Sequence, residues 1–96
     1  MTFLEKYNID IKDKELLLTS LTHTSYANEH NVASYERLEY LGDSVLQLIV
    51  SEYLYCNFDL KEGAMSKMRA SFVCEEALAS YAREIGYIPY IRVGHG

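Results

Sequence analysis

The sequence contains little proline, little cysteine and no long apolar run, and each shortage excludes a class of protein. A single proline together with 49% hydrophobic residues excludes a disordered tail or linker. The two cysteines, Cys56 and Cys74, are too few for a disulfide framework and lack the spacing of metal ligands. We therefore expect both to be free and mostly buried thiols in a reducing compartment.

No stretch of the chain approaches the roughly 20 consecutive apolar residues that a membrane helix requires. The opening residues, MTFLEKYNID, also lack the basic start and the apolar centre of a signal peptide. We therefore expect a cytoplasmic protein with no membrane partner. Its 96 residues correspond to one domain.

Basic residues are also scarce, with 9 Lys and Arg against 14 Asp and Glu and a net charge of −5. This balance argues at first sight against a nucleic-acid partner, because phosphate contacts favour Lys and Arg. However, acids that hold divalent cations lower the formal charge and still face phosphate through the metal. The net charge therefore does not exclude RNA or DNA.

Helical periodicity runs through most of the chain, and no β-alternation of useful length interrupts it. The sequence therefore predicts an all-α single domain. Thr2 is a candidate N-cap for the first short helix, with Glu5 at the spacing of a capping box. The polar, non-periodic residues 27–34 are expected to form a loop. The predicted helices span residues 2–9, 13–22, 35–57, 64–73 and 74–86, the last one ending at Gly86.

The longest predicted helix, residues 35–57, has Ser34 as a candidate N-cap and carries apolar residues on more than one face. This pattern indicates a central helix that other helices surround. One face holds Leu38, Leu41, Val45 and Leu48, and another holds Leu46, Ile49, Val50 and Tyr53.

Three acids, Glu36, Glu39 and Asp43, lie on a single stripe of this helix. At about 100° per residue, Glu36 and Asp43 differ by only about 20°, and Glu39 lies one turn from Asp43. Two interpretations remain open on spacing alone. In the first, the helix dipole stabilises the acids of the first turn, and these acids pair with Arg37 or a remote basic group. Alternatively, oxygen ligands at this spacing hold Mg²⁺ or Mn²⁺.

The residues around this stripe resemble a known family. The segment ERLEYLGDSVL, residues 36–46, is similar to the signature of the ribonuclease III family of double-strand-specific endoribonucleases. Three flanking segments also resemble this family in the same order. They are LTHTSYANE at 21–29, EGAMSKMRASFVCEEALASYAREIG at 62–86 and YIRVGHG at 90–96.

The resemblance implies a role for five residues. Glu39 and Asp43 are implied to be catalytic ligands of Mg²⁺, with Mn²⁺ as an alternative. Glu36, and more weakly Glu62, are implied to be acids on the RNA or dimer side. Tyr40 stands where the family usually has Phe, a ring implied to plug a socket on the second subunit of a homodimer. A phenol at this position needs a partner for its hydroxyl.

A structural role is favoured for the other polar residues of these segments. His23 is expected at a helix end or in packing rather than as a base, and Ser25 and Tyr26 are expected in caps and packing. Lys67 and Arg69 could contact phosphate, but on an amphipathic helix we expect them to form salt bridges.

The resemblance implies an enzyme in which metal-activated water cleaves double-stranded RNA, with roles in the processing of rRNA and mRNA precursors. It implies no small-molecule cofactor. The family also has a second acidic pair and a double-stranded-RNA-binding domain, and neither is expected within residues 1–96. We therefore expect the N-terminal two-thirds of a nuclease domain that is inactive by itself. The alternatives are a non-catalytic helical dimer that binds structured RNA, or a structural domain whose acids pair with Arg37, Arg69 or Arg83.

Overall fold

A computed structural model describes residues 1–95 as an all-helical chain. Within these residues no strand forms, and a single parallel bridge joins Thr22 to Arg92. No helix in this part of the chain is long and apolar enough to cross a membrane. The predicted fold class is confirmed. The elements are α1 (Thr2–Lys6), α2 (Lys14–Ser20), α3 (Thr24–His30), α4 (Glu36–Asn57), α5 (Glu62–Val73), α6 (Glu75–Ile85) and the 3₁₀ helix η1 (Ile88–Tyr90).

The bounds of α4, α5 and α6 follow the prediction closely, and Gly86 ends α6 in the left-handed conformation that favours glycine. Three local predictions are wrong, among them Ser34 as the N-cap of α4, because Tyr35 holds that position. Thr2 is the first residue of α1 and not its N-cap. Part of the predicted loop is helical, because the His23 side chain caps α3 by accepting a hydrogen bond from the Ser25 amide.

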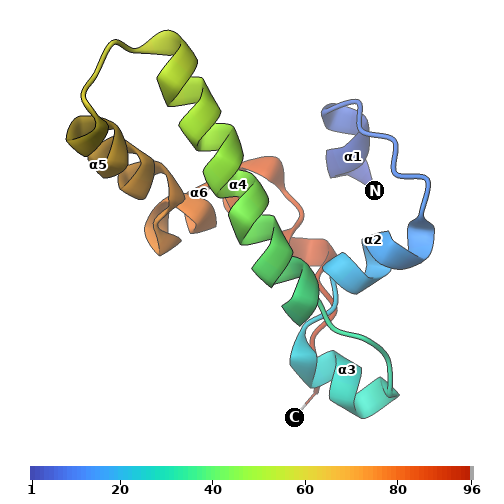
Figure 1. Ribbon diagram of the computed structural model, residues 1–96. Coiled ribbons are helices and arrows are strands. Elements are labelled where there is room, and N and C mark those ends of the chain that lie inside the picture. The colour runs from blue at the N-terminus through green and yellow to red at the C-terminus, as the bar shows by residue number, and fades with distance from the viewer. Residues whose placement is uncertain (96) are drawn as a thin grey trace.

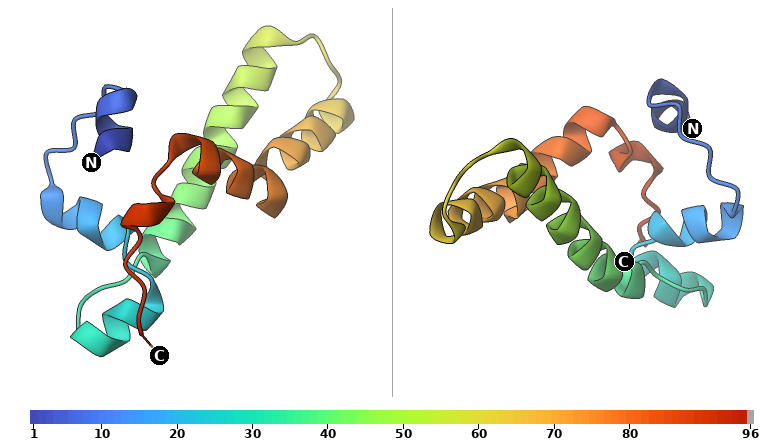
Figure 2. Two further views of the ribbon diagram at one scale, coloured as in Figure 1. Left: turned by 180° about the vertical axis from the view of Figure 1, so that it is seen from behind. Right: turned by 45° about the horizontal axis from the view of Figure 1, so that its top comes forward.

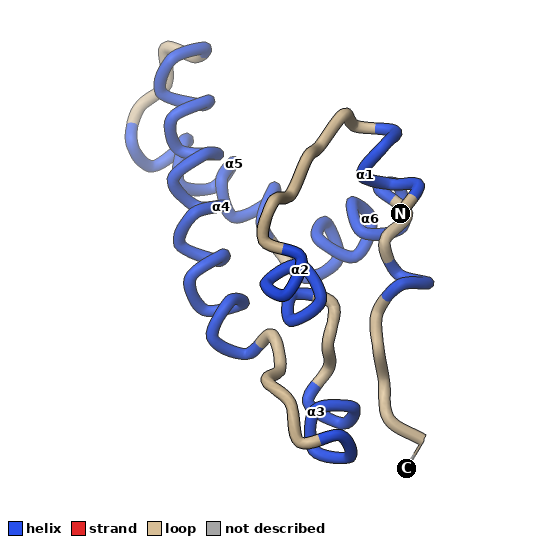
Figure 3. The backbone as a smooth tube through the Cα atoms, turned by 90° about the vertical axis from the view of Figure 1, so that its right-hand side faces the viewer, coloured by secondary structure: helices blue, strands red, loops and turns tan. Residues whose placement is uncertain are grey.

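Helix α4 forms a long diagonal spine, and α5 returns beside its C-terminal half (Figure 1). Helix α6 packs against α5, and the chain then passes to η1. Helices α1 and α2 lie on the opposite side of α4 from α5 (Figure 2), and α3 lies near the C-terminal end of the chain (Figure 3). The arrangement leaves the acidic turn of α4 close to the α2–α3 junction.

The chain is more extended than a compact domain of its size. Its radius of gyration is 15.9 Å, whereas about 13 Å is typical for 100 residues. The accessible surface is 7653 Å², whereas a folded protein of 11.1 kDa exposes about 5,700 Å². Much surface that a compact fold would bury therefore faces solvent.

Helix α4 contributes to this exposed surface, so the prediction of a surrounded central helix is wrong for the described residues. Only Leu54 of this helix is buried. Cys56 and Cys74 are free, as predicted, but both are exposed rather than buried. The helix has exposed apolar side chains on two faces, because no described element covers them: Tyr40, Leu41, Val45, Leu48, Ile49, Tyr53 and Tyr55.

A small core forms instead at the α2–α3 junction, where Leu17, Leu21, Thr22 and Ala27 are buried. The C-terminal residues dock onto this core at very close range. The Gly94 amide donates to Ser25 Oγ at 2.9 Å. A Cβ atom on Gly94 would lie 2.8 Å from the Ser25 carbonyl oxygen, so only glycine allows this approach without a backbone shift.

Candidate functional site

The acidic stripe begins where α4 begins. The Ser34 hydroxyl accepts a hydrogen bond from the Glu36 amide at 3.3 Å, one residue before the N-cap position, which Tyr35 occupies. Glu36 and Glu39 lie in the first turn, where carboxylates favour the positive end of the helix dipole. Asp43 lies one turn further along. The uninterrupted helix therefore brings all three acids to one face.

These acids line a groove of about 630 Å³ between α4 and α6. Leu78 of α6 stands opposite the acidic turn, and Gly42 leaves the α4 side of the groove open because it has no side chain. The groove thus brings together four of the five residues that the sequence singles out. Its lining residues are Glu36, Glu39, Tyr40, Gly42, Asp43, Ser44, Leu46 and Leu78.

The three carboxylates are exposed, and this exposure changes the electrostatic argument. Water screens the repulsion between them, so the helix does not require a cation for its stability. Glu36 accepts a hydrogen bond from Thr24 Oγ1 at 3.4 Å. Among residues 1–95, no Arg or Lys forms an ion pair with the three acids. Their faces toward the groove are therefore available to a ligand.

Arg69 does not form the expected salt bridge in the described part of the chain. Its Nη1 donates to Ser51 Oγ at 2.9 Å, which ties α5 to α4. The structural alternative pairs the acids with Arg37, Arg69 or Arg83. Arg69 contacts Ser51 instead of the acids.

Glu39 also borders a second, smaller groove of about 390 Å³ with Ser20, Tyr35, Leu38, Tyr87 and Ile91. Burial raises the pKa of the Tyr35 phenol, and the charges of Glu39 and Tyr87 raise it further. Tyr35 is therefore a neutral hydrogen-bonding group beside a candidate metal ligand. Sequence reasoning did not identify it, because the pocket depends on Tyr87 from a distant part of the chain.

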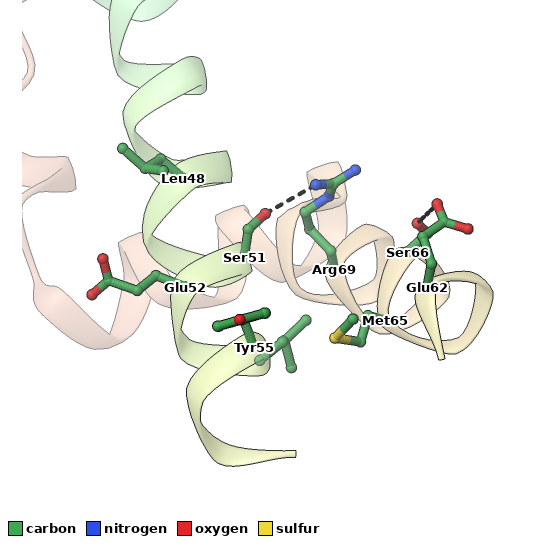
Figure 4. Close-up of a pocket in the computed structure, with 9 residues that line it drawn as sticks. Leu48, Ser51, Glu52, Tyr55, Glu62, Met65, Ser66 and Arg69 are labelled. Carbon is green, nitrogen blue, oxygen red and sulfur yellow. Dashed lines mark hydrogen bonds between the residues drawn. The ribbon is translucent and has the colours of Figure 1, made fainter. Parts of the chain in front are cut away.

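Glu62 lies apart from the other acids, on the first turn of α5. Its Oε1 accepts a hydrogen bond from Ser66 Oγ at 3.0 Å. It lines a groove of about 400 Å³ between α4 and α5, which Figure 4 shows with the Arg69–Ser51 hydrogen bond. The lining residues are Leu48, Ser51, Glu52, Leu54, Tyr55, Glu62, Met65, Ser66 and Arg69.

Tyr40 is the most exposed large hydrophobic residue among those described, with 82% of its surface accessible. It continues along α4 into a stripe with Leu48, 68% exposed, and Tyr55, 79% exposed. At about 100° per residue these three positions fall within about 80° of one another. Exposed apolar stripes of this kind mark interaction surfaces.

His23, Ser25 and Tyr26 take part in the cap and packing contacts expected of them. His23 Nδ1 contacts the Ser25 hydroxyl at 2.8 Å and accepts from the Ser25 amide at 3.2 Å. Tyr26 packs its ring against His30 at 3.9 Å between centroids. The prediction of caps and packing for His23, Ser25 and Tyr26 is confirmed.

Comparison with known proteins places the chain and its fold in a family. Residues 13–96 match the model of the family described as Ribonuclease-III-like. This chain belongs to the ribonuclease-III-like family. Proteins named Ribonuclease 3 are similar over nearly the whole chain: that of Streptococcus uberis is 53% identical over 94% of this chain, and that of Caldanaerobacter subterraneus subsp. tengcongensis is 54% identical over 100%.

Solved structures of the family have the same fold. A nuclease domain of ribonuclease III from Campylobacter jejuni, described as structurally flexible in a region involved in dimer formation, matches 97% of this chain at 37% identity with a TM-score of 0.88. A second structure of that nuclease domain matches with a TM-score of 0.86. This chain spans 64% and 62% of those two structures. It spans 41% and 44% of the two curated relatives.

The residues present fit a divalent cation of the Mg²⁺ type. Mg²⁺ retains several waters and is held by one or two carboxylates together with substrate phosphate. Glu39 and Asp43 supply two such carboxylates, one turn apart and open to the groove. Residues 1–95 contain no group of three or more His, Cys, Asp or Glu side chains placed to hold a metal. Glu39 and Asp43 are thus the candidate metal ligands among the described residues.

Proposed function

We propose that this chain provides part of an endoribonuclease that cleaves double-stranded RNA with a divalent metal, preferably Mg²⁺ and alternatively Mn²⁺. The observation that carries the proposal is the pair Glu39 and Asp43, one turn apart and unpaired with basic residues in the described chain. Membership of the ribonuclease-III-like family supports the reaction class.

Glu39 and Asp43 would hold the metal through their carboxylate oxygens. When bound, a divalent cation supplies charge stabilisation for the phosphate and lowers the pKa of water. Glu36 would keep its hydrogen bond to Thr24 and so align the first turn. The neutral Tyr35 phenol would add no charge beside Glu39. In the proposed enzyme, a second acidic pair outside residues 1–96 completes the coordination.

The RNA would be recognised by its A-form shape and its phosphates rather than by base edges, since the deep and narrow major groove of RNA hides its bases. The chain has few basic residues for direct phosphate contact, so the metal is the main route to the backbone. We further propose that the substrates are precursors of rRNA and mRNA in the cytoplasm, and that no small-molecule cofactor takes part.

A second candidate is a non-catalytic helical dimer that binds structured RNA. Among residues 1–95 no group of three or more His, Cys, Asp or Glu side chains is placed to hold a metal, which favours this alternative for the chain taken by itself. Both functions predict RNA binding, and only the first predicts a metal site at Glu39 and Asp43.

Calorimetric titration with Mn²⁺ tests the metal site. We expect the wild-type chain to bind weakly, because the two carboxylates leave most of the coordination to water. The double variant Glu39→Gln, Asp43→Asn should lose this binding, since amides carry no charge. Glu75→Gln, Glu76→Gln removes the same charge from the first turn of α6 and serves as the matched control. Equal Mn²⁺ affinity in the wild type and the Glu39→Gln, Asp43→Asn variant would show that these two residues are not metal ligands.

We also propose that the exposed stripe of α4 forms the interface of a homodimer. A two-fold axis near Leu48 would place Tyr40 about 12 Å from the axis, opposite the end of the α4–α5 groove near Tyr55 of a second copy. That groove combines apolar walls with the polar groups of Ser51, Glu52 and Arg69. It therefore offers both a cavity for the ring and partners for its hydroxyl.

Sedimentation at several concentrations tests this interface. Tyr40→Ala should weaken dimerisation at least about tenfold, since buried aromatic anchors dominate interface energies. Tyr40→Phe keeps the ring and should retain most of the affinity. Tyr7→Ala removes an exposed ring that lies outside the stripe and should behave as the wild type. A wild-type chain that remains monomeric at high concentration would contradict the proposed dimer.

A further inference from the structure

The most buried polar side chain of the described residues belongs to Thr22, at the α2–α3 junction, with 0% of its surface exposed. Its Oγ1 accepts hydrogen bonds from Arg92 Nε at 3.0 Å and from Arg92 Nη2 at 2.6 Å. The same hydroxyl donates to the Leu18 carbonyl at 2.5 Å. One donor and two acceptor sites are the full capacity of a hydroxyl group, and all three are used.

The backbone reinforces this contact on both sides. The Arg92 amide donates to the Leu21 carbonyl at 2.6 Å, and the His23 amide donates to the Arg92 carbonyl at 2.9 Å. The Arg92 guanidinium also lies over the Tyr26 ring, 4.6 Å from its centroid. The C-terminal segment is thereby fixed to the junction by charge-assisted, backbone and cation–π contacts together.

The backbone of Thr22 also contacts the start of α4, the helix that carries the acidic stripe. The Thr22 carbonyl accepts a hydrogen bond from the Tyr35 amide at 3.0 Å. Tyr35 is the N-cap of α4, and its own carbonyl accepts from the Glu39 amide at 2.7 Å. A continuous series of hydrogen bonds therefore runs from Arg92 through Thr22 and Tyr35 to Glu39.

We propose that Arg92 and Thr22 are positioning residues that fix the first turn of α4, and with it Glu36 and Glu39. The inference rests on the proposed metal site for its functional meaning. Neither residue is proposed to touch metal or RNA. Their effect is geometric, because a misplacement of about 1 Å at a catalytic centre can cost about a hundredfold in rate.

Hydrogen exchange of backbone amides tests the proposal on the metal-free chain. Thr22→Val keeps the shape of the side chain but leaves the guanidinium and the Leu18 carbonyl without their hydroxyl partner. Exchange at Tyr35 and in the first turn of α4 should rise about tenfold, the effect of losing a charge-assisted hydrogen bond. Exchange in the last turn of α4, near Asn57, should not change.

Three further variants separate positioning from general stability. Thr22→Ser retains the hydroxyl and should restore the wild-type pattern. Arg92→Lys keeps the charge but loses the two-nitrogen contact to Thr22. It should show the same faster exchange in the first turn of α4, and it replaces Thr22→Val as the test if Thr22→Val does not fold. Tyr90→Phe removes a different hydroxyl contact of the C-terminal region, the one to Thr2, and should leave the first turn of α4 unchanged.

Mn²⁺ titration of the same variants gives the functional readout, with a several-fold weaker affinity expected for Thr22→Val. Exchange that rises equally along all of α4, or an Mn²⁺ affinity that stays unchanged while the first turn loosens, would overturn the inference. If the wild type and the Glu39→Gln, Asp43→Asn variant bind Mn²⁺ equally, the metal site is wrong. The exchange pattern then still decides whether Thr22 holds the start of α4.

Discussion

Replacing Asp43 with Asn in a chain of the same length as the curated relatives should reduce cleavage of double-stranded RNA by more than about a hundredfold. Mutating a residue that only orients a metal ligand typically lowers metal affinity or activity about 10- to 100-fold. Loss of a ligand itself should lower the activity further. The change is small in volume and lies on an exposed helix face, so the fold should persist. A labelled RNA duplex incubated with Mg²⁺ gives the rate.

Two controls sharpen this result. Thermal unfolding should show a midpoint close to that of the wild type, which separates lost chemistry from lost structure. Asp59→Asn makes the same chemical change in the loop after α4, away from the groove, and should leave the rate intact. Full activity in the Asp43→Asn protein would mean that this carboxylate is not a ligand.

Residues 1–96 by themselves are expected not to cleave RNA at an enzymic rate. The two carboxylates that could hold the metal lie on one helix, and the described residues supply no further group opposite them. Excess Mg²⁺ would raise occupancy but could not fix orientation, and orientation accounts for much of the rate of a positioned reaction. The measurement compares this chain with one extended through the acidic helix that the family resemblance implies.

The comparison also decides between the two candidate functions. A chain of 96 residues that binds the duplex without cutting it, beside an extended chain that cuts, fits the proposed enzyme. Equal cleavage by the two chains would show that a second acidic pair is unnecessary. An extended chain that binds but does not cut would favour the non-catalytic dimer.

Local patterns were enough to predict α4 and the acids on it. The segment lacks proline from residue 35 to residue 57 and keeps a helical apolar period, so its predicted bounds agree closely with the structure, although Tyr35 rather than Ser34 is the N-cap. Helix α3 escaped prediction because the residues of its second half, Ala27 to His30, are mostly polar and show no apolar stripe. Its stability comes from the His23 cap and from docking of the C-terminal residues.

Other features could not be predicted because they depend on contacts between distant residues. Periodicity shows that α4 is apolar on two faces, but it does not show what covers them, and the faces are exposed in residues 1–95. The same limit applies to the pocket that Tyr35 shares with Tyr87. Helical spacing predicted that Glu36, Glu39 and Asp43 share one face, whereas their exposure and lack of basic partners emerged only from the structure. Glu62, which the resemblance added more weakly, lines a different groove.

The Arg92–Thr22 contact has a consequence for the order in which the protein forms during synthesis. The two residues are 70 positions apart, which corresponds to about 4 to 14 s of translation at about 5–20 residues per second. During this interval α4 can become helical, but Arg92, which fixes its first turn through Thr22, has not yet been synthesised. The acidic turn therefore acquires its final orientation late, when the C-terminal segment returns to the α2–α3 junction and closes the long loop.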